Sequence, residues 1–299
     1  MPLFEQYHAI IPDFSRFQQS LHNPLPVHLR VNRLLITPQR LKEYLAKKDV
    51  HVKQVLSPHD TLYVAPGLES PGNLLEYYLG YIHPQALTSA LAAIALSPEP
   101  GAYLLDMCAA PGGKSAHCAE LMNNTGLVVA NDLYAMRHMA LGHTLSRLGV
   151  LNAVMTAYQA QQFPLRQRFD YVLADVPCSG EGRFRKTRAD AQFREHKGGV
   201  KLTDLQRRII LRGFDLLKPG GEMLYSTCTY NPDENESVVH YLLQKRPATL
   251  CPIQVTADVE PGILKWRDQR YDQRLSRAER FYPHRIDSVG FFMARIIKE

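Results

Sequence analysis

Apolar residues between positions 97 and 299 follow two alternating patterns. Short apolar segments typical of buried strands alternate with longer segments whose apolar residues recur at helical spacing. The predicted strands cover residues 102–107, 127–132, 153–158, 171–176, 222–227 and 289–297, and the predicted helices include 112–122, 134–148 and 204–217. Strands that alternate with helices indicate a mostly parallel α/β sheet that is covered by helices on both faces.

Two helix boundaries are predicted from local residue types. The sequence Lys218-Pro-Gly-Gly is expected to end the preceding helix, because proline and glycine do not continue a helix. Asn231 is expected to be the N-cap of a later helix, with Pro232 in its first turn. Asp233 and Glu234 would then lie at the positive end of that helix dipole.

Residues 1–75 differ in composition from the rest, with a basic helix predicted at 41–48 and a Pro/Gly-rich stretch at 65–73. We predict a small α/β appendage over residues 1–75 and a main domain over 76–299. A chain of 299 residues, of which 45% are hydrophobic, is long enough to bury such a core.

Features of membrane, secreted and metal-binding proteins are not found in the sequence. No apolar run approaches the roughly 18 residues of a membrane span, and the first residues, MPLFEQYHAIIPDF, do not resemble a secretory signal. The five cysteines include no CxxC pair, and no HExxH occurs, which argues against a disulfide framework and a metal site. We expect a cytoplasmic protein with reduced thiols, no metal and no obligate protein partner.

Positive charge is concentrated between residues 183 and 212. This segment holds ten Lys and Arg residues against three acids, a local charge of +7, whereas the net charge of the whole chain is +6. A basic run of this kind is usually a solvated helical surface. It becomes a surface for a polyanion if nucleic-acid chemistry lies beside it.

A glycine-containing loop follows the predicted strand 102–107, at the end of the strand where α/β sheets bind nucleotides. The loop reads Asp106-Met-Cys-Ala-Ala-Pro-Gly-Gly-Lys114, and Asp132 at the end of the next strand can accept hydrogen bonds from ribose hydroxyls. The glycine pattern of dinucleotide-binding proteins is absent, and a P-loop requires glycine where Cys108 stands. An ordinary turn between strand and helix stays an alternative.

Two cysteines stand at predicted strand ends. Cys178 follows Asp175-Val-Pro after the strand 171–176, and Cys228 follows Ser-Thr after the strand 222–227. A single cysteine is most often a small buried hydrophobic residue. If these strands are neighbours, however, both thiols converge on the crevice next to the glycine loop.

Four motifs, taken together and in this order, resemble the RNA cytosine-5 methyltransferases of the NOL1/NOP2/Sun group, which includes the RsmB- and RsmF-like enzymes. They are DMCAAPGGK, DVPCSGEG, YSTCTYNPDENE and GFFMARI. The similarity spans residues 76–299 and extends to Arg30-Val-Asn32. It implies a class I methyltransferase, a Rossmann-like α/β fold with a mostly parallel, seven-stranded sheet, and S-adenosylmethionine as the cofactor.

The resemblance also implies a cofactor site. The residues expected to surround S-adenosylmethionine are Cys108, Ala109, Ala110, Pro111, Gly112, Gly113, Lys114 and Asp175. Asp132 is expected on the ribose, with Arg137 nearby. Gln159 stands where the family usually has an aspartate, and its carbonyl oxygen can accept a hydrogen bond from the adenine amino group.

The chemistry of this reaction explains the residue types at the strand ends. Carbon 5 of cytosine is a poor nucleophile until a thiolate adds to carbon 6, and the resemblance assigns that role to Cys228. A buried carboxyl with a raised pKa can hydrogen-bond the ring nitrogen, and Asp175 is placed for it. The resemblance implies that Cys178 assists product release and that Lys186 lies close to the site.

Alternatives remain for both the activity and the substrate. A DNA methyltransferase would use Cys178 as its nucleophile, a reading that the second cysteine motif disfavours. A catalytically weak RNA-binding assembly factor and a P-loop-like nucleotide hydrolase are the other hypotheses. Structured RNA is the expected partner, through the appendage and the basic segment. Ribosomal RNA is favoured over transfer RNA, because PCSGEG resembles the bacterial ribosomal branch.

Overall fold

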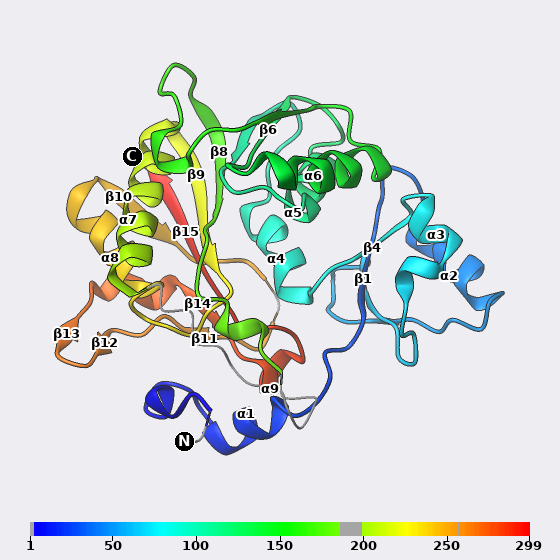
Figure 1. The fold of residues 1–299 in the computed structure, drawn as a ribbon, viewed down its shortest axis with the longest axis horizontal. Helices are drawn as coiled ribbons and strands as arrows, with labels where there is room; N and C mark the ends of the chain where they lie inside the picture. The colour runs from blue at the N-terminus through cyan, green and yellow to red at the C-terminus, as the bar shows by residue number, and fades with distance from the viewer. Residues whose placement is uncertain (1–2, 186–198, 256) are drawn as a thin grey trace.

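A computed structural model describes residues 3–185, 199–255 and 257–299. It contains a large mixed sheet flanked by helices and a smaller sheet to one side (Figure 1). Over the described residues the large sheet has nine strands, in the order β11-β14-β15-β9-β8-β5-β6-β7 with β10 beside β15. These strands are β5 (Tyr103–Asp106), β6 (Leu127–Asn131), β7 (Ala153–Thr156), β8 (Phe169–Asp175), β9 (Leu217–Thr227), β10 (Ala248–Cys251), β11 (Glu260–Pro261), β14 (Glu279–Phe281) and β15 (Phe291–Lys298).

The predicted fold class is confirmed, and so is the parallel arrangement at its centre. Strands β9, β8, β5, β6 and β7 pair in parallel, whereas β15 pairs antiparallel with β9. The described residues give nine strands rather than the predicted seven: six correspond to the strands predicted from the apolar pattern, and β10, β11 and β14 are added on the antiparallel side. These three strands have two to four residues each, too few for a clear alternating pattern.

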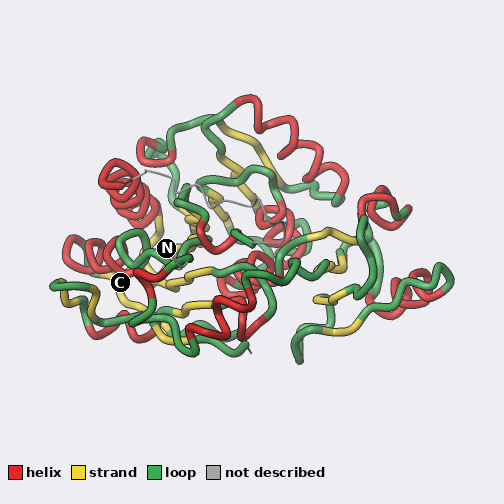
Figure 2. The backbone as a smooth tube through the Cα atoms, turned by 60° about the horizontal axis from the view of Figure 1, so that its bottom comes forward, coloured by secondary structure: helices red, strands yellow, loops and turns green. Residues whose placement is uncertain are grey.

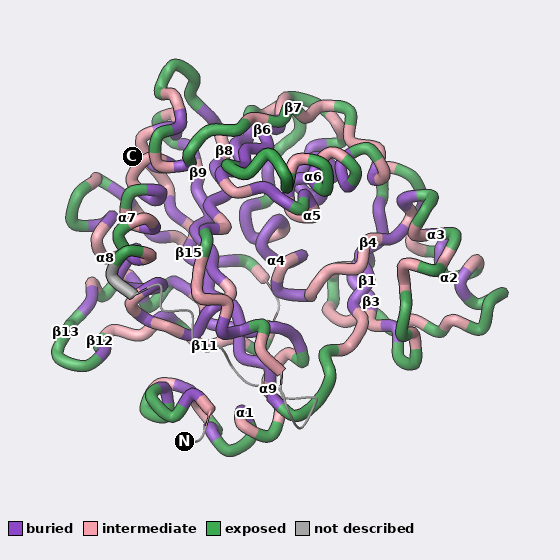
Figure 3. Tube along the Cα trace, in the orientation of Figure 1, coloured by how far each residue is buried: buried purple, intermediate pink, exposed green. Residues whose placement is uncertain are grey.

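Helices cover both faces of the sheet, because successive strand residues point to opposite faces. Val172 and Ala174 of β8 belong to one apolar core, while Leu173 belongs to the other. Figure 1 shows α7 and α8 on one side and α4, α5 and α6 on the other. Their bounds are α4 (Leu87–Leu96), α5 (Gly113–Leu121), α6 (Ala135–Arg147), α7 (Gly199–Leu216) and α8 (Glu236–Lys245). The strands between them are largely buried (Figure 3).

The smaller sheet is antiparallel, with the order β2-β3-β1-β4, and lies beside the main body (Figure 2). Its elements are β1 (His28–Val31), α2 (Pro38–Ala46), β2 (Lys53–Gln54), β3 (Leu62–Val64), α3 (Leu75–Tyr78) and β4 (Ile82–Pro84). The predicted boundary after residue 75 stays a prediction, although β4 pairs with β1 beyond it.

Buried polar contacts join the small sheet to the main body. Arg30 of β1 forms a buried ion pair with Glu120 of α5. Asn32 donates hydrogen bonds from Nδ2 to the carbonyl oxygens of Gly80, at 3.0 Å, and Leu148, at 2.8 Å. The Arg-Val-Asn sequence therefore connects the two parts of the molecule.

The first residues of the described chain pack on the main body and not on the small sheet. The short helices η1 (Glu5–Tyr7) and α1 (Phe14–Ser20) bury Tyr7 and Phe17 in the core that also contains Tyr230. The ring of Phe17 meets the ring of Tyr230 edge to face, with centroids 5.2 Å apart. Helix α1 lies beside α9 (Pro283–Ile286), as Figure 1 shows.

One predicted helix start is wrong, and one predicted helix end is confirmed. Asn231 does not cap α8, which begins at Glu236; its Oδ1 accepts a hydrogen bond from the Asp233 amide at 3.0 Å and so forms a local turn. Helix α7 ends at Leu216, and Lys218-Pro-Gly-Gly lies within β9, at a register shift against β8. The remaining short elements are η2 (Pro71–Asn73), η3 (Ala160–Gln162), η4 (Glu181–Arg183), β12 (Lys265–Trp266), β13 (Gln269–Arg270) and η5 (Gln273–Arg277).

Replacing Glu236 by alanine is expected to lower the free energy of unfolding by about 3–5 kcal/mol, since it leaves a buried charge unpaired. Arg280 donates from Nε and Nη2 to the two carboxylate oxygens of Glu236, both at 2.6 Å, and both side chains are almost fully buried. Urea denaturation measures the loss. The control is Asp60→Ala, which removes an exposed ion pair with Arg33 and should cost at most about 1 kcal/mol. Equal losses for the two variants would contradict the expectation.

Candidate active site

The strand order places the two predicted cysteines side by side. Strands β8 and β9 are parallel neighbours, so the segments that follow them leave the same edge of the sheet. The Sγ atoms of Cys178 and Cys228 lie 3.4 Å apart, and the Cys228 amide donates to Cys178 Sγ at 3.4 Å. The convergence predicted from the sequence is confirmed. All five cysteines are free thiols.

The two thiols differ in their ease of ionisation. The hydrogen bond from Cys178 lowers the pKa of Cys228 below its ordinary value, and the positive charges of Arg183 and Lys114 act in the same direction. The same hydrogen bond, together with burial, raises the pKa of Cys178 well above its ordinary value. Cys228 is therefore the better thiolate, and Cys178 is the thiol that donates a hydrogen bond to it.

Asp175, the carboxyl that was predicted to hydrogen-bond the ring nitrogen of cytosine, forms an ion pair with Lys114. Lys114 Nζ lies 2.8 Å from Asp175 Oδ2, and Ser226 Oγ donates to Asp175 Oδ1 at 2.8 Å. Burial opposes the charge of Lys114, but the carboxylate of Asp175 outweighs it and raises the pKa of the lysine. The lysine of the glycine loop thus reaches across to the end of β8, a contact that the linear sequence does not reveal.

Asp106, at the end of β5, is a buried carboxyl with a raised pKa. Burial, reinforced by the nearby charge of Asp175, raises the pKa of Asp106 to about 7. Its Oδ2 accepts a hydrogen bond from Ser115 Oγ at 2.6 Å, and its Oδ1 accepts one from the Cys108 amide at 3.3 Å. Asp106 therefore fixes both ends of the glycine loop at the strand.

Asp132 and Arg137 lie against the glycine loop; their predicted place at the ribose of the cofactor stays a prediction. Asp132 Oδ2 accepts a hydrogen bond from the Ala110 amide at 3.1 Å and lies 3.0 Å from Arg137 Nη1. Arg137 Nη2 also donates to the Ala110 carbonyl oxygen at 2.6 Å. The carboxylate is 2% exposed, so its orientation is fixed by these partners.

The residues present fit S-adenosylmethionine in charge and in side-chain type. Asp132 offers a carboxylate to ribose hydroxyls, while Asp106 and Asp175 place negative charge beside a sulfonium. Two apolar side chains beside Asp132 stay exposed, Leu133 at 45% and Tyr158 at 48%, and both can pack on an adenine ring. The sequence analysis did not identify these two. An apolar residue directly after a strand-end acid is the signal that would have identified Leu133.

Gln159 lies next to this region. Asn131, at the end of β6, donates from Nδ2 to the Tyr158 carbonyl oxygen at 2.9 Å and accepts from the Tyr158 amide at 2.9 Å. This bracing holds residues 158–159 close to Asp132. Gln159 itself is exposed, and its Oε1 accepts a hydrogen bond from Gln161 at 2.8 Å. Its predicted hydrogen bond to adenine stays a prediction.

Replacing Gly113 by alanine is expected to destabilise the protein by about 1–3 kcal/mol, because a side chain there overpacks the loop. A Cβ at this position would lie 2.7 Å from His83 Nε2, and His83 Nδ1 is held 3.0 Å from Arg147 Nη2. The gain in helix propensity, up to about 1 kcal/mol, is smaller. Thermal unfolding tests this against Gly72→Ala, where a Cβ meets nothing within 4 Å. Equal melting temperatures for the two variants would contradict it.

Lys186 lies outside the described residues. So do five other charged positions of the segment 183–212: Arg188, Asp190, Arg194, Glu195 and Lys197. The described basic residues of this segment are Arg183, Arg185, Lys201, Arg207, Arg208 and Arg212. Arg183 acts on the pKa of Cys228, so part of the basic segment lies near the thiols.

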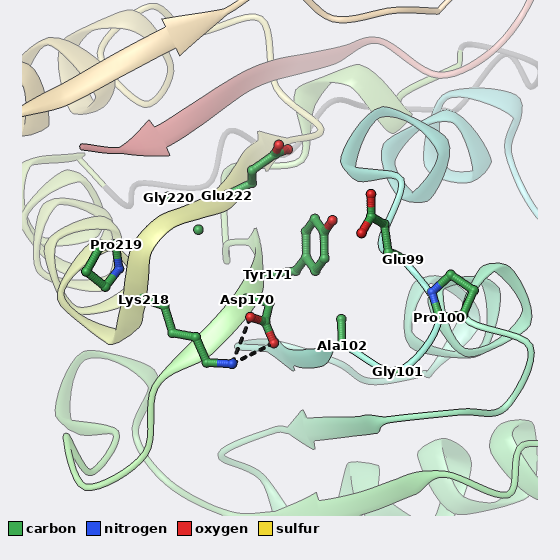
Figure 4. Close-up of a pocket in the computed structure, with 11 residues that line it drawn as sticks. Glu99, Pro100, Gly101, Ala102, Asp170, Tyr171, Lys218, Pro219, Gly220 and Glu222 are labelled. Carbon is green, nitrogen blue, oxygen red and sulfur yellow. Dashed lines mark hydrogen bonds and ion pairs between the residues drawn. The ribbon is translucent and has the colours of Figure 1, made fainter.

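A cavity of about 430 Å³ lies at the opposite edge of the sheet (Figure 4). It is lined by Glu99, Tyr171, Lys218 and Glu222, among others, and Lys218 pairs with Asp170 at 2.8 Å. Tyr171 and Glu222 belong to the first halves of β8 and β9, whereas both cysteines follow the last residues of these strands. This cavity is therefore separate from the candidate active site.

The described residues hold neither a cluster for a metal ion nor a helix that could cross a membrane. Within residues 3–185, 199–255 and 257–299, no group of three or more His, Cys, Asp or Glu side chains is arranged to hold a metal ion. Over the same residues, no helix has the length and apolar character needed to cross a membrane.

Known proteins resemble this chain both in sequence and in fold. The chain is 36% identical over 289 residues to the 26S rRNA (cytosine-C(5))-methyltransferase nsun-1 of Caenorhabditis elegans, which covers 94% of this chain and 43% of that relative. It is 34% identical over 297 residues to the tRNA (cytosine(49)-C(5))-methyltransferase of Pyrococcus abyssi, covering 99% of this chain and 95% of that relative. The chain thus spans less than half the length of the nematode protein.

A solved structure of a methyltransferase homolog protein from Pyrococcus horikoshii superposes with a TM-score of 0.84 and 33% identity, over 95% of this chain and 90% of that chain. Residues 93–297 match the sequence model of a family described as 16S rRNA methyltransferase RsmB/F. This match covers more than half of the chain and includes the glycine loop and both cysteines. The chain therefore belongs to the RsmB/F methyltransferase family, which confirms the resemblance seen in its motifs.

Proposed function

We propose that this protein transfers a methyl group from S-adenosylmethionine to carbon 5 of a cytosine in structured RNA, with Cys228 as the nucleophile. The observation that carries the proposal is the cysteine pair, whose sulfur atoms lie 3.4 Å apart and in which Cys178 lowers the pKa of Cys228. The relatives from Caenorhabditis elegans and Pyrococcus abyssi are named as RNA cytosine-C(5) methyltransferases, which supports the same reaction.

The first step is the addition of the Cys228 thiolate to carbon 6 of the target cytosine. A bond forms between sulfur and carbon 6. The electron pair of the carbon 5–carbon 6 double bond becomes a double bond between carbon 4 and carbon 5, and the pair of the carbon 4–nitrogen 3 double bond moves onto nitrogen 3. Lys114, which is paired with Asp175 and lowers the pKa of Cys228, can donate a hydrogen bond to the ring as this charge develops. Carbon 5 becomes nucleophilic as a result.

S-adenosylmethionine, when bound, supplies the methyl group that carbon 5 takes. We assign its ribose to Asp132 and its adenine to the exposed side chains of Leu133 and Tyr158. The loop from Cys108 to Lys114 would hold the rest of the cofactor, with its backbone fixed by Asp106 and Arg137. These residues orient the donor toward the base and need not react themselves.

The last step restores the aromatic ring. Solvent water takes the proton from carbon 5, and the electron pair of that carbon–hydrogen bond re-forms the carbon 5–carbon 6 double bond. The bond from carbon 6 to sulfur breaks, and its electron pair returns to Cys228 as the thiolate. We assign Cys178 to this step, because its sulfur lies 3.4 Å from the sulfur that must leave, where a thiol can donate a hydrogen bond to it. A thiol at that position stabilises the departing thiolate.

The substrate is proposed to be ribosomal RNA, with transfer RNA as the second candidate. The matching family is described by 16S rRNA, and the nematode relative by 26S rRNA, whereas the archaeal relative is named for tRNA. The RNA-binding role of residues 1–75, the cytoplasmic location and the role of Lys186 stay predictions.

Transfer of labelled methyl groups tests the proposal. The full chain is incubated with labelled S-adenosylmethionine and with either unmodified ribosomal RNA or unmodified transfer RNA, and the RNA is digested to nucleosides. The label is expected in 5-methylcytidine. Label in another nucleoside would contradict the reaction. RNA binding without any transfer would favour the assembly-factor hypothesis, and hydrolysis of ATP would favour the nucleotide hydrolase.

A further inference from the structure

A buried line of hydroxyl groups ties together the two loops that carry the cysteines. Ser179, directly after Cys178, donates from Oγ to Thr229 Oγ1 at 2.8 Å. Thr229, directly after Cys228, donates in turn to Glu181 Oε2 at 2.8 Å. Ser179 and Thr229, the neighbours of the two cysteines, are therefore hydrogen-bonded to each other, and the line of hydroxyl groups ends on the Glu181 carboxylate.

Glu181 also receives a hydrogen bond from the start of the chain. The Tyr7 hydroxyl donates to Glu181 Oε1 at 3.0 Å, across 174 positions of sequence, so both carboxylate oxygens have a hydroxyl donor. Tyr7 is 3% exposed and Glu181 is 5% exposed. The Tyr7 ring packs against Trp266, with centroids 5.8 Å apart, which keeps the hydroxyl directed at the carboxylate. Tyr7, in η1, thus contacts the carboxylate on which the line of hydroxyl groups ends.

Backbone groups reinforce this connection. The Gly182 amide donates to the Cys228 carbonyl oxygen at 2.9 Å, and the Ser179 amide donates to Glu234 Oε2 at 2.9 Å. A shift of one cysteine loop relative to the other would have to break several of these bonds together. Buried hydrogen bonds without a replacement partner cost free energy, so such a shift is disfavoured.

Glu181 explains which hydroxyl groups of the line donate and which accept. A carboxylate accepts hydrogen bonds but donates none, so Thr229 and Tyr7 must both donate to it, and Thr229 is left to accept from Ser179. Burial, opposed by these two hydrogen bonds and reinforced by the charge of Glu234, raises the pKa of Glu181 to about 7. Glu181 has no direct contact with either sulfur atom in the set of hydrogen bonds above.

We propose that Glu181, acting through Thr229 and Tyr7, is a positioning residue that fixes the Cys178 thiol against Cys228 and thereby sets the rate at which the covalent RNA adduct is released. This inference rests on the proposed roles of the two cysteines. Formation of the adduct needs Cys228 and an activated ring and gains from Cys178 only through the pKa of Cys228, whereas release depends on the Cys178 thiol itself. A displacement of about 1 Å can cost up to about a hundred-fold in rate, so a loosened Cys178 slows release selectively.

A matched pair of substitutions at Thr229 tests this proposal. Thr229→Val keeps the shape of the side chain but removes the hydroxyl, and Thr229→Ser keeps the hydroxyl. The full chain is mixed with S-adenosylmethionine and RNA in single-turnover experiments, and the adduct is followed on denaturing gels over time. We expect Thr229→Val to slow release at least about ten-fold, with formation within about two-fold of wild type, because the variant loses the hydrogen bonds that the Thr229 hydroxyl makes with Ser179, Glu181 and the Asn231 amide. Thr229→Ser should release at close to the wild-type rate.

Tyr7→Phe is the second variant, because it removes the other donor to Glu181 and leaves the ring in place. We expect it to slow release about three-fold, and its result decides the question if Thr229→Val does not fold. Release at the wild-type rate in the folded variants would overturn the proposal. So would equal slowing of formation and release, or equal slowing by Val and Ser at position 229.

Failure of this inference can be told apart from failure of the proposed function. Cys178→Ala, run beside these variants, is expected to hold the adduct. If it forms no adduct, the cysteine roles are wrong and the inference falls with them. If it holds the adduct while Thr229→Val and Tyr7→Phe release normally, the cysteine roles stand and the positioning role of Glu181 is wrong.

Discussion

Replacing Cys228 by alanine is expected to reduce methyl transfer to RNA at least about a thousand-fold, because no other group in the site can add to carbon 6. Cys178 is a poor substitute, because burial raises the pKa of its thiol even without the partner cysteine. The initial rate of labelled methyl transfer measures the loss.

Cys251→Ala provides the control for this substitution. Cys251 lies on β10, on the antiparallel side of the sheet, so its removal should leave the rate within about two-fold of wild type. Binding of S-adenosylmethionine should be unchanged in Cys228→Ala, because the cofactor is assigned to other residues. Methyl transfer by Cys228→Ala at a rate close to wild type would remove this cysteine from the mechanism.

Replacing Cys178 by alanine is expected to have the opposite signature, with a covalent protein–RNA complex that accumulates instead of turning over. The nucleophile is intact in this variant, so the bond to carbon 6 still forms, but the thiol that serves its breakage is gone. On a denaturing gel a large share of the protein should migrate with the RNA, whereas wild type should show little.

The double variant Cys178→Ala, Cys228→Ala should form no such complex, which ties the adduct to Cys228. Adducts formed by Cys228→Ala and not by Cys178→Ala would reverse the two roles. That result would match the DNA-methyltransferase arrangement, in which the cysteine after Asp-Val-Pro attacks the base.

The hydrolase hypothesis is weakened by the partner of Lys114. In a P-loop the lysine of Gly-Lys-Ser reaches toward phosphate groups. Here the same lysine lies 2.8 Å from the Asp175 carboxylate, which neutralises its positive charge. Asp106 and Asp132 make the surroundings of the loop more acidic still. Such a site suits a positively charged sulfonium better than a triphosphate.

The central strands were predictable from sequence because each is a short apolar segment followed by a turn. Strand β5, predicted at residues 102–107, spans Tyr103–Asp106, and β6, predicted at 127–132, spans Leu127–Asn131. The start of α8 was not predictable in the same way. Asn231 and the residues after it have the types of a helix start, but the Asn231 side chain closes a turn instead, and five residues pass before the helix begins.

The place of the site was predictable, but the pairing of its charges was not. A motif puts Cys178 and Cys228 at strand ends, and sheet topology then brings them together. The partner of Asp175 depends instead on how a loop from a different strand is folded. The contact between Tyr7 and Glu181 joins residues 174 positions apart, and no local pattern announces it.

The most direct test of the account is to identify the residue that bonds to the RNA. Wild-type protein is incubated with S-adenosylmethionine and RNA that contains 5-fluorocytidine, whose fluorine cannot leave as a proton, so the adduct cannot eliminate. The complex is digested with trypsin and ribonuclease, and the modified peptide is sequenced by mass spectrometry. Arg183 and Arg212 lie between the two cysteines, so they fall on different peptides. The account predicts a methylated nucleotide on Cys228; a nucleotide on Cys178 would contradict it.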